Sequence, residues 1–424
     1  MRSILTVPRL LVAAAVFCSF IVVGLFVAKF FRILPSIGII GLVLTAIGYA
    51  FLHGRGEEAS KDWRPYVALS CVFLIHAAAG IHTEQANMSE YTRDVVLQSP
   101  FLLLPLAFWL LPGLPTQYLR ILWQLFIGCV VVAALVATGN YLLHPAEINE
   151  MYLHSKIMPT EPDHIRFSLM VTLATAAALV LFAFDKTLAK TNRQLLLFAV
   201  VLLALFQHLL AVRSGLVTFY AIGLIMIGWL VVRARQFRQA AILAAVLLVL
   251  PVISYASFPT FRNKFANTQD DLSKVSNTAA ANDYSLVARV YSYKVAAKVV
   301  EANPWFGVSK ADMETELAVH YRQDYPSIRA ESYIMPHNQF IYLAVAFGLL
   351  GVLLFTLCFY YPLLWTWPRF APLIVIQYAI VSLSFLVEYT LETQIGLTYS
   401  LLFILLALNG TSNGEEKAGS WRPS

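Results

Sequence analysis

Charge and cysteine are both scarce in this sequence. Lys, Arg, Asp and Glu make up 13% of its 424 residues, whereas a soluble globular protein has about 25%. The 4 cysteines lie singly inside apolar runs, which excludes a disulfide framework and a zinc site of paired cysteines. With so little charge and 59% hydrophobic residues, the chain is not an ordinary soluble protein, a disordered chain or a coiled coil.

Long hydrophobic runs dominate the sequence instead. The mean hydropathy is +0.69, and at about 20 residues per crossing the apolar residues suffice for about a dozen transmembrane helices. The first run is too long for a secretory signal peptide and lacks a cleavage site, so we interpret it as a retained span. The sequence therefore predicts an all-α integral membrane protein with about twelve transmembrane helices.

These runs divide the chain into four parts. Residues 1–258 are predicted to form spans one to nine, and residues 259–337 a long helical loop. Residues 338–409 are predicted to form spans ten to twelve, and residues 410–424 a polar tail. An even number of spans places both ends of the chain on one side of the membrane.

The distribution of positive charge predicts the orientation of the chain. If both ends are cytoplasmic, fifteen of the 30 Lys and Arg residues lie in cytoplasmic segments and six in short outer segments. The other nine lie in the long loop, which is too long for the positive-inside rule to apply. We therefore expect cytoplasmic termini and an outward-facing loop, and the net charge of +6 does not indicate nucleic-acid binding.

The long loop is the one segment able to form a subdomain outside the membrane. Its polar stretch 267–282 is predicted to be mobile. Apolar residues at helical spacing predict a helix over 284–301, which the sequence Asn-Pro-Trp-Phe-Gly at 303–307 ends, and a second amphipathic helix over 311–325. We expect both helices to lie against the outer mouth of the bundle; the alternative is that they only anchor the loop at the membrane surface.

A histidine and an asparagine follow this loop directly. The segment 331–340 runs into an apolar span, which places His337 at the outer end of a membrane helix. Histidine side chains titrate near pH 6.5, so a neutral imidazole there can accept a proton from a hydroxyl nucleophile. Asn338 is then in place to orient a sugar or a phosphate. The alternative is that the pair caps the helix.

The order of these segments resembles a known family. Arg289 lies in the first predicted loop helix, Asn-Pro-Trp-Phe-Gly-Val follows at 303–308, and Pro-His-Asn-Gln-Phe at 336–340 precedes Gly348 and Gly351. This pattern is similar to the outer loop of bacterial O-antigen ligases, whose superfamily includes O-antigen polymerases and O-linked oligosaccharyltransferases. The number of spans and the place of the long loop extend the resemblance to nearly the whole chain.

The resemblance implies an enzyme of lipopolysaccharide biosynthesis. Such a ligase transfers a preassembled O-antigen glycan from undecaprenyl diphosphate to a sugar hydroxyl of lipid A–core oligosaccharide. It acts at the periplasmic face of the bacterial inner membrane. We interpret the reaction as inverting, with His337 as the general base on the acceptor hydroxyl.

Four outward-facing arginines are candidates to hold the donor diphosphate: Arg166, Arg213, Arg262 and Arg289. A diphosphate leaving group needs fixed positive charge, and the guanidinium suits bidentate phosphate contact. Arg213 lies between two apolar runs with almost no loop, where a charge is costly unless it faces the bundle interior or a headgroup. The alternatives are a charge that marks a tight turn at Arg213 and solvated positions for the others.

Two acidic residues lie at the outer end of the eleventh predicted span. Glu388 and Glu392 either position an arginine or the acceptor sugar, or only end a helix. The outer segments hold no Asp-x-Asp motif and no cluster of Asp, Glu and His with metal-ligand spacing. We therefore predict a reaction without a metal or other cofactor, in which arginine supplies the positive charge.

Other functions remain open on the sequence. An O-antigen polymerase uses the same donor with a growing glycan as acceptor, and a protein O-oligosaccharyltransferase modifies a protein. A flippase or transporter for lipid-linked sugars would place charges at mid-membrane depth, whereas here they gather near the outer loop. The sequence leaves the oligomeric state open.

Overall fold

The structure of the protein is a computed structural model that describes residues 6–53, 61–153, 156–367 and 371–412. Every regular element in these ranges is an α-helix or a short 3-10 helix. Ten helical segments there are long and apolar enough to cross a membrane. The prediction of an all-α integral membrane protein is confirmed.

The α-helices of the described ranges, in chain order, are α1 (Val7–Val27), α2 (Leu34–His53), α3 (Arg64–Ala78), α4 (Met88–Gln98), α5 (Pro100–Leu110), α6 (Thr116–Leu143), α7 (Pro145–Leu153), α8 (His164–Phe184), α9 (Lys190–Leu210), α10 (Arg213–Val232), α11 (Phe237–Ser257), α12 (Pro259–Ser273), α13 (Ser285–Ala302), α14 (Met313–Asp324), α15 (Gln339–Thr366), α16 (Pro372–Phe385) and α17 (Gln394–Ser412). The 3-10 helices are η2 (Ala79–Ile81), η3 (Gln85–Asn87), η4 (Thr278–Asn282), η5 (Ala330–Ser332) and η7 (Thr390–Glu392).

The ten long segments correspond to the first ten predicted spans. The eleventh and twelfth correspond to α16, which has 14 residues, and to α17, whose apolar part is Gln394–Gly410. Both are shorter than the roughly 20 residues of an ordinary crossing, so the number twelve stays a prediction. Residues 413–424 of the predicted tail lie outside the described residues. Five positive residues that were predicted to lie in cytoplasmic segments, two of them in this tail, are also outside: Arg2, Arg55, Arg369, Lys417 and Arg422.

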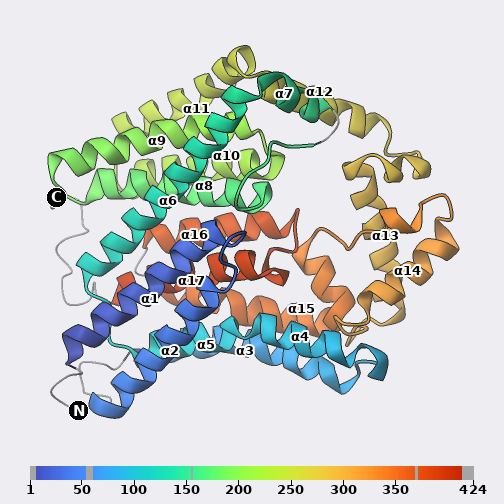
Figure 1. The fold of residues 1–424 in the computed structure, drawn as a ribbon, viewed down its shortest axis with the longest axis horizontal. Helices are drawn as coiled ribbons and strands as arrows, with labels where there is room; N and C mark the ends of the chain where they lie inside the picture. Colours follow the sequence, from blue (N-terminus) through green and yellow to red (C-terminus); the bar gives the residue numbers. More distant parts are fainter. Residues whose placement is uncertain (1–5, 54–60, 154–155, 368–370, 413–424) are drawn as a thin grey trace.

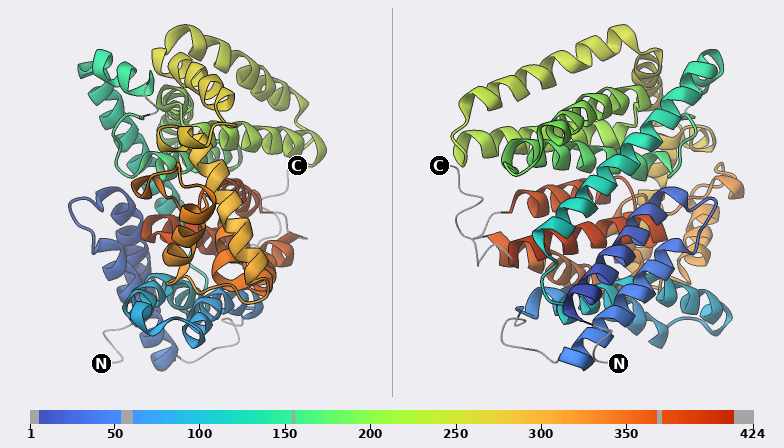
Figure 2. Two further views of the ribbon diagram at one scale, coloured as in Figure 1. Left: turned by 90° about the vertical axis from the view of Figure 1, so that its right-hand side faces the viewer. Right: turned by 60° about the vertical axis from the view of Figure 1, so that its left-hand side comes forward.

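The long helices lie side by side, roughly along the longest dimension of the molecule (Figure 1). The first turn of α1 and the last turns of α17 lie at one end of this bundle, and α13 and α14 lie at the opposite end. Seen from that opposite end, α13 and α14 cover the middle of the bundle (Figure 2, left). The loop helices are therefore confirmed as helices that lie against one mouth of the bundle.

Two helices form the buried centre. Both α8 and α17 are buried almost all round. α8 packs against α6, α9, α10 and α16, while α17 packs against α5, α16 and η7. The many Ala and Thr residues of α8 allow its neighbours to approach closely. The starts of these two helices frame the site described below, so the most rigid part of the bundle supports it.

The polar stretch 267–282 is the place where the sequence prediction was wrong. It forms the end of α12 and the 3-10 helix η4. The buried residues of α12 are Thr260, Lys264, Asn267 and Asp271, spaced four, three and four residues apart on one face of the helix. The polar composition of this stretch predicted a mobile segment. In the structure, partners on other helices satisfy most of these polar side chains.

The Asn-Pro-Trp-Phe-Gly segment docks into a break in α15. Gly348 interrupts that helix with φ 66°, and the backbone N–H groups of Val308 and Ser309 donate to the carbonyls of Val345 and Ala346 at 2.9 and 3.0 Å. Gly348 has no room for a side chain, since a Cβ would lie 2.2 Å from the carbonyl carbon of Trp305. This junction fixes the loop helices relative to the start of α15.

Candidate active site

His337 lies directly before α15, and Asn338 caps that helix. The Asn338 Oδ1 accepts hydrogen bonds from the backbone N–H groups of Phe340 and Ile341 at 3.0 and 3.1 Å. Its Nδ2 donates to the carbonyl of Leu386 at 3.3 Å. The structure thus shows the capping interaction, which ties His337 to the end of α16; contact of Asn338 with an acceptor stays a prediction.

Glu388 lies beside the imidazole of His337. The distance from His337 Nδ1 to Glu388 Oε2 is 3.3 Å. The carboxylate favours the tautomer with a proton on Nδ1, which leaves the lone pair on Nε2. The hydroxyl of Tyr293 donates to the backbone carbonyl of His337 at 2.8 Å, and the ring of Tyr389 lies 5.1 Å from the imidazole between centroids. The histidine is therefore held on three sides.

Two of the predicted arginines lie close to Glu388. Although burial opposes its ionisation, the hydrogen bond with His337 and the charges of His337, Arg166 and Arg289 lower the pKa of Glu388. Arg289 Nη1 also donates to the carbonyl of Val387 at 3.2 Å. The carboxylate is only 4% exposed, so it stays charged because these cations surround it.

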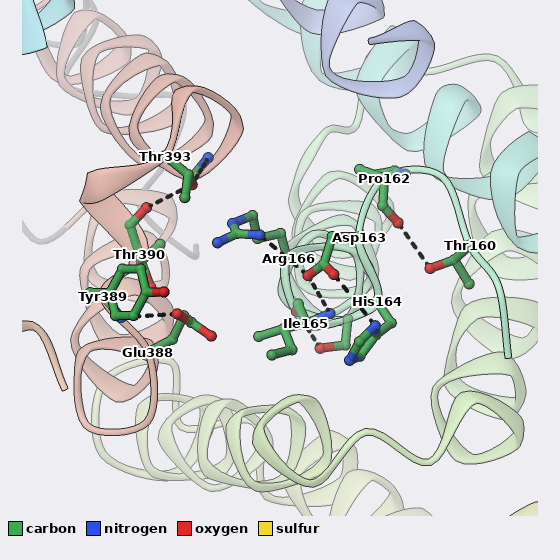
Figure 3. Close-up of polar contacts among 12 residues, drawn as sticks. Thr160, Pro162, Asp163, His164, Ile165, Arg166, Glu388, Tyr389, Thr390 and Thr393 are labelled. Atoms are coloured by element: carbon green, nitrogen blue, oxygen red, sulfur yellow. Dashed lines mark hydrogen bonds and ion pairs between the residues drawn. The ribbon is translucent and has the colours of Figure 1, made fainter. Parts of the chain in front are cut away.

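Arg166 projects from the first turn of α8 toward the segment that holds Glu388 and Tyr389 (Figure 3). Its Nη1 lies 3.3 Å from Oδ1 of Asp163, the residue that caps α8. Its buried Nε has no hydrogen-bond partner among the described residues. Arg166 and Glu388 come from segments far apart in the sequence and face one another across the start of α8 (Figure 3).

Arg213 begins α10 and faces α12. Its Nη2 donates to Asn267 Oδ1 and to Asp271 Oδ2, both at 3.0 Å. Asp271 is fully buried, and a buried carboxylate needs such a partner. The turn between α9 and α10 is tight, which agrees with the alternative that Arg213 marks a tight turn. The guanidinium nevertheless contacts α12 and so joins this loop helix to α10 of the bundle.

Lys264 is a site residue that the sequence did not single out. It is 8% exposed, and burial, followed by the charge of Arg213, lowers its pKa to about 8; the charge of Arg289 acts in the same direction, and that of Asp271 opposes it. The charges of Arg213 and Arg289 thus both act on Lys264. The spacing of polar residues along α12, visible in the sequence, was the signal that could have found it.

The structure does not bring Arg262 into this cluster. It lies two residues before Lys264, which turns it about 200° around the helix axis, and its side chain is exposed. Of the predicted residues, His337, Glu388, Arg166 and Arg289 thus come together, whereas Arg213 contacts Asn267 and Asp271 of α12.

The family model described as O-antigen ligase matches residues 198–356. Over this segment, which is less than half of its length, the chain is similar to the O-antigen ligase family. Its members are glycosyltransferase-like enzymes of the O-antigen ligase and polymerase type. No curated protein matched the chain.

The segment matched to the O-antigen ligase family runs from α9 into α15. It includes His337, Arg213, Arg289 and Lys264, together with the glycine junction between the loop and α15. Glu388 comes from outside this segment. Arg166 also lies outside it, so the candidate site combines the matched segment with residues that precede and follow it in the chain.

The second acidic residue predicted at this end of the bundle, Glu392, belongs to a different network. Its Oε2 lies 2.7 Å from Nζ of Lys310, which also lies 3.3 Å from Oδ1 of Asp94. Its Oε1 accepts from Gln339 Nε2 at 2.8 Å. Glu392 therefore ties the loop and α15 to α4, and none of these contacts involves His337.

Over the ranges that the structure describes, no group of three or more His, Cys, Asp and Glu side chains is arranged to hold a metal ion. The metal-independent reaction stays a prediction.

Proposed function

We propose that the protein is an O-antigen ligase of lipopolysaccharide biosynthesis. It would transfer a preassembled glycan from undecaprenyl diphosphate to a sugar hydroxyl of lipid A–core oligosaccharide. The observation on which this proposal rests is the His337–Glu388 pair, 3.3 Å apart, inside a cluster of arginines at the mouth with α13 and α14. A base beside fixed positive charge is what transfer from a diphosphate to a hydroxyl requires.

The base in this reaction is His337. As the acceptor oxygen forms its bond to the anomeric carbon of the glycan, Nε2 of His337 takes the hydroxyl proton. Glu388 holds the ring in the required tautomer and stabilises the imidazolium that forms. The bond between the anomeric carbon and the diphosphate oxygen breaks in the same displacement, so the configuration of that carbon inverts and undecaprenyl diphosphate leaves.

The arginines stabilise the leaving diphosphate. Arg166, Arg213 and Arg289 supply charge-assisted hydrogen bonds where negative charge develops. The buried Nε atoms of Arg166 and Arg213 have no hydrogen-bond partner within the described part of the chain. Arg262 is left out of this proposal because its side chain is exposed away from the cluster.

The short helices α16 and α17 suit a lipid-linked donor. Residues 386–393 between them lack α-helical structure, and Glu388, Thr390 and Glu392 in this stretch are buried. Irregular backbone within a membrane protein is stable only where other protein groups satisfy it or where it lines a cavity. This arrangement supports a site at the level of the lipid headgroups, reached by the donor from the bilayer. We place it at the periplasmic face of the bacterial inner membrane, with both termini in the cytoplasm.

An O-antigen polymerase or a protein O-oligosaccharyltransferase would use the same donor chemistry with another acceptor. The test is therefore transfer by the purified full-length protein, supplied with lipid-linked glycan and lipid A–core in the presence of EDTA. We expect glycan on the core, formed at the same rate without the chelator. Glycan elongation or protein modification without a core product would overturn the ligase, and loss of transfer in EDTA would overturn the metal-independent mechanism.

A further inference from the structure

Gln339 is a fully buried side chain at the first position of α15, two residues after His337. Its Nε2 donates to Oε1 of Glu392 at 2.8 Å, and its Oε1 accepts a hydrogen bond from the backbone N–H of Leu391 at 3.0 Å. Residues 386–393 lack α-helical structure, so their buried backbone groups need partners outside a helix. The amide of Gln339 supplies one and joins this segment to the start of α15.

Three consecutive residues hold this segment at three places. Asn338 Nδ2 donates to the carbonyl of Leu386 at its beginning, at 3.3 Å. His337 Nδ1 lies 3.3 Å from Oε2 of Glu388 in its middle, and Gln339 holds its far end. The contact between imidazole and carboxylate thus lies between two fixed ends, and its geometry depends on both of them.

We propose that Gln339 is a positioning residue for glycan transfer. It holds the segment that carries Glu388 and thereby sets the place of this carboxylate beside His337. This inference rests on the proposed function of the same site. Gln339 takes no part in the proton transfer itself, but the base must be held accurately, because a misplacement of about 1 Å can cost about a hundredfold in rate.

Gln98 binds the same two residues from the opposite side. It is the last residue of α4 and is fully buried. Its Nε2 donates to the carbonyl of Leu391 at 3.2 Å and to Oε2 of Glu392 at 3.1 Å. Without Gln98, the segment remains joined to α15, which begins directly after the base. Without Gln339, it remains joined only to α4, which carries neither the base nor its carboxylate.

The matched variants Gln339→Met and Gln98→Met test the proposal in the purified full-length protein. Each removes buried hydrogen bonds to the same two residues, so both should lower the melting temperature by comparable amounts. At saturating donor and lipid A–core, kcat per folded protein should fall about tenfold in Gln339→Met. It should stay within about twofold of wild type in Gln98→Met. Equal kcat values in the two variants would show that Gln339 only stabilises the fold, and would overturn the proposal.

A double variant shows whether Gln339 acts through Glu388. Once Glu388→Gln has removed the carboxylate, Gln339→Met should lower kcat by no more than about twofold further. An undiminished tenfold loss in that background would overturn the proposal. Should Gln339→Met not fold, the shorter Gln339→Asn takes its place, with Gln98→Asn as its control and the same outcomes. If wild type itself transfers no glycan to lipid A–core, the proposed function fails, and this inference fails with it.

Discussion

Glu388 and Glu392 lie four residues apart between α16 and α17, and both are buried. Glu388 faces His337, and the charges of Arg166 and Arg289 act on it. Glu392 is enclosed by Lys310, Gln339 and Gln98, all from the protein itself. Two like residues on one segment thus differ in their partners: Glu392 pairs with the buried Lys310, whereas Glu388 pairs with His337 close to arginines.

Removal of the base should have the largest effect on transfer. His337→Ala is expected to lower the rate by about 10²–10⁴-fold, the usual contribution of general-base catalysis. The initial rate of glycan transfer to lipid A–core checks this, with the elution volume in size-exclusion chromatography as the test of folding. A variant that transfers at the wild-type rate would remove His337 from the mechanism.

Charge reversal in the cluster should come next. Arg289→Glu is expected to raise the KM for the donor by about a hundredfold, since the loss of one hydrogen bond to a charged group costs about 1.5–3 kcal/mol and a repulsive charge is added. Arg213→Glu should act in the same direction. The exposed Arg262→Glu is the matched control and should stay within about twofold, since surface charges away from a site have little effect. An equal effect at positions 262 and 289 would contradict the arrangement described here.

Glu388→Gln should reduce the rate less than loss of the base itself. The amide still occupies the space but cannot stabilise an imidazolium as a carboxylate does, so we expect a loss of about 10–100-fold, equivalent to a charge-assisted hydrogen bond of about 1.5–3 kcal/mol. Steady-state rates at saturating donor and acceptor measure it. A loss confined to the acceptor KM would instead indicate that Glu388 binds the acceptor sugar.

Glu392→Gln should have the smallest effect on the rate of each folded molecule and a large effect on stability. It leaves the buried Lys310 with Asp94 alone, and breaking a buried pair costs about 3–5 kcal/mol. We expect a lower melting temperature, with activity per folded protein within about twofold of wild type. The double variant Glu392→Gln with Lys310→Met should recover part of the stability; a catalytic defect without destabilisation would show that the two glutamates act alike.

Hydropathy and helical spacing are local properties, and what depends on them was predictable. The spans, the two amphipathic loop helices and the place of His337 before a membrane helix all follow from residues close together in the sequence. The pairing of His337 with Glu388 joins positions 51 residues apart, so the sequence could suggest each residue but not their contact.

The features that sequence analysis missed depend on distant partners. Asp271 was assigned to a mobile polar stretch because the residue that satisfies it, Arg213, comes from another helix. Lys264 was overlooked in favour of Arg262 because the helical spacing of Thr260, Lys264, Asn267 and Asp271 marks one face of α12, whereas its burial depends on the helices packed against it.

The most direct test of the account is a double-mutant cycle on the rate of glycan transfer, with wild type, His337→Ala, Glu388→Gln and the double variant. If Glu388 acts through His337, its substitution costs nothing further once the imidazole is gone, so the double variant should equal His337→Ala. A double variant whose loss is the product of the two single losses would contradict the account, because Glu388 would then act independently of the base.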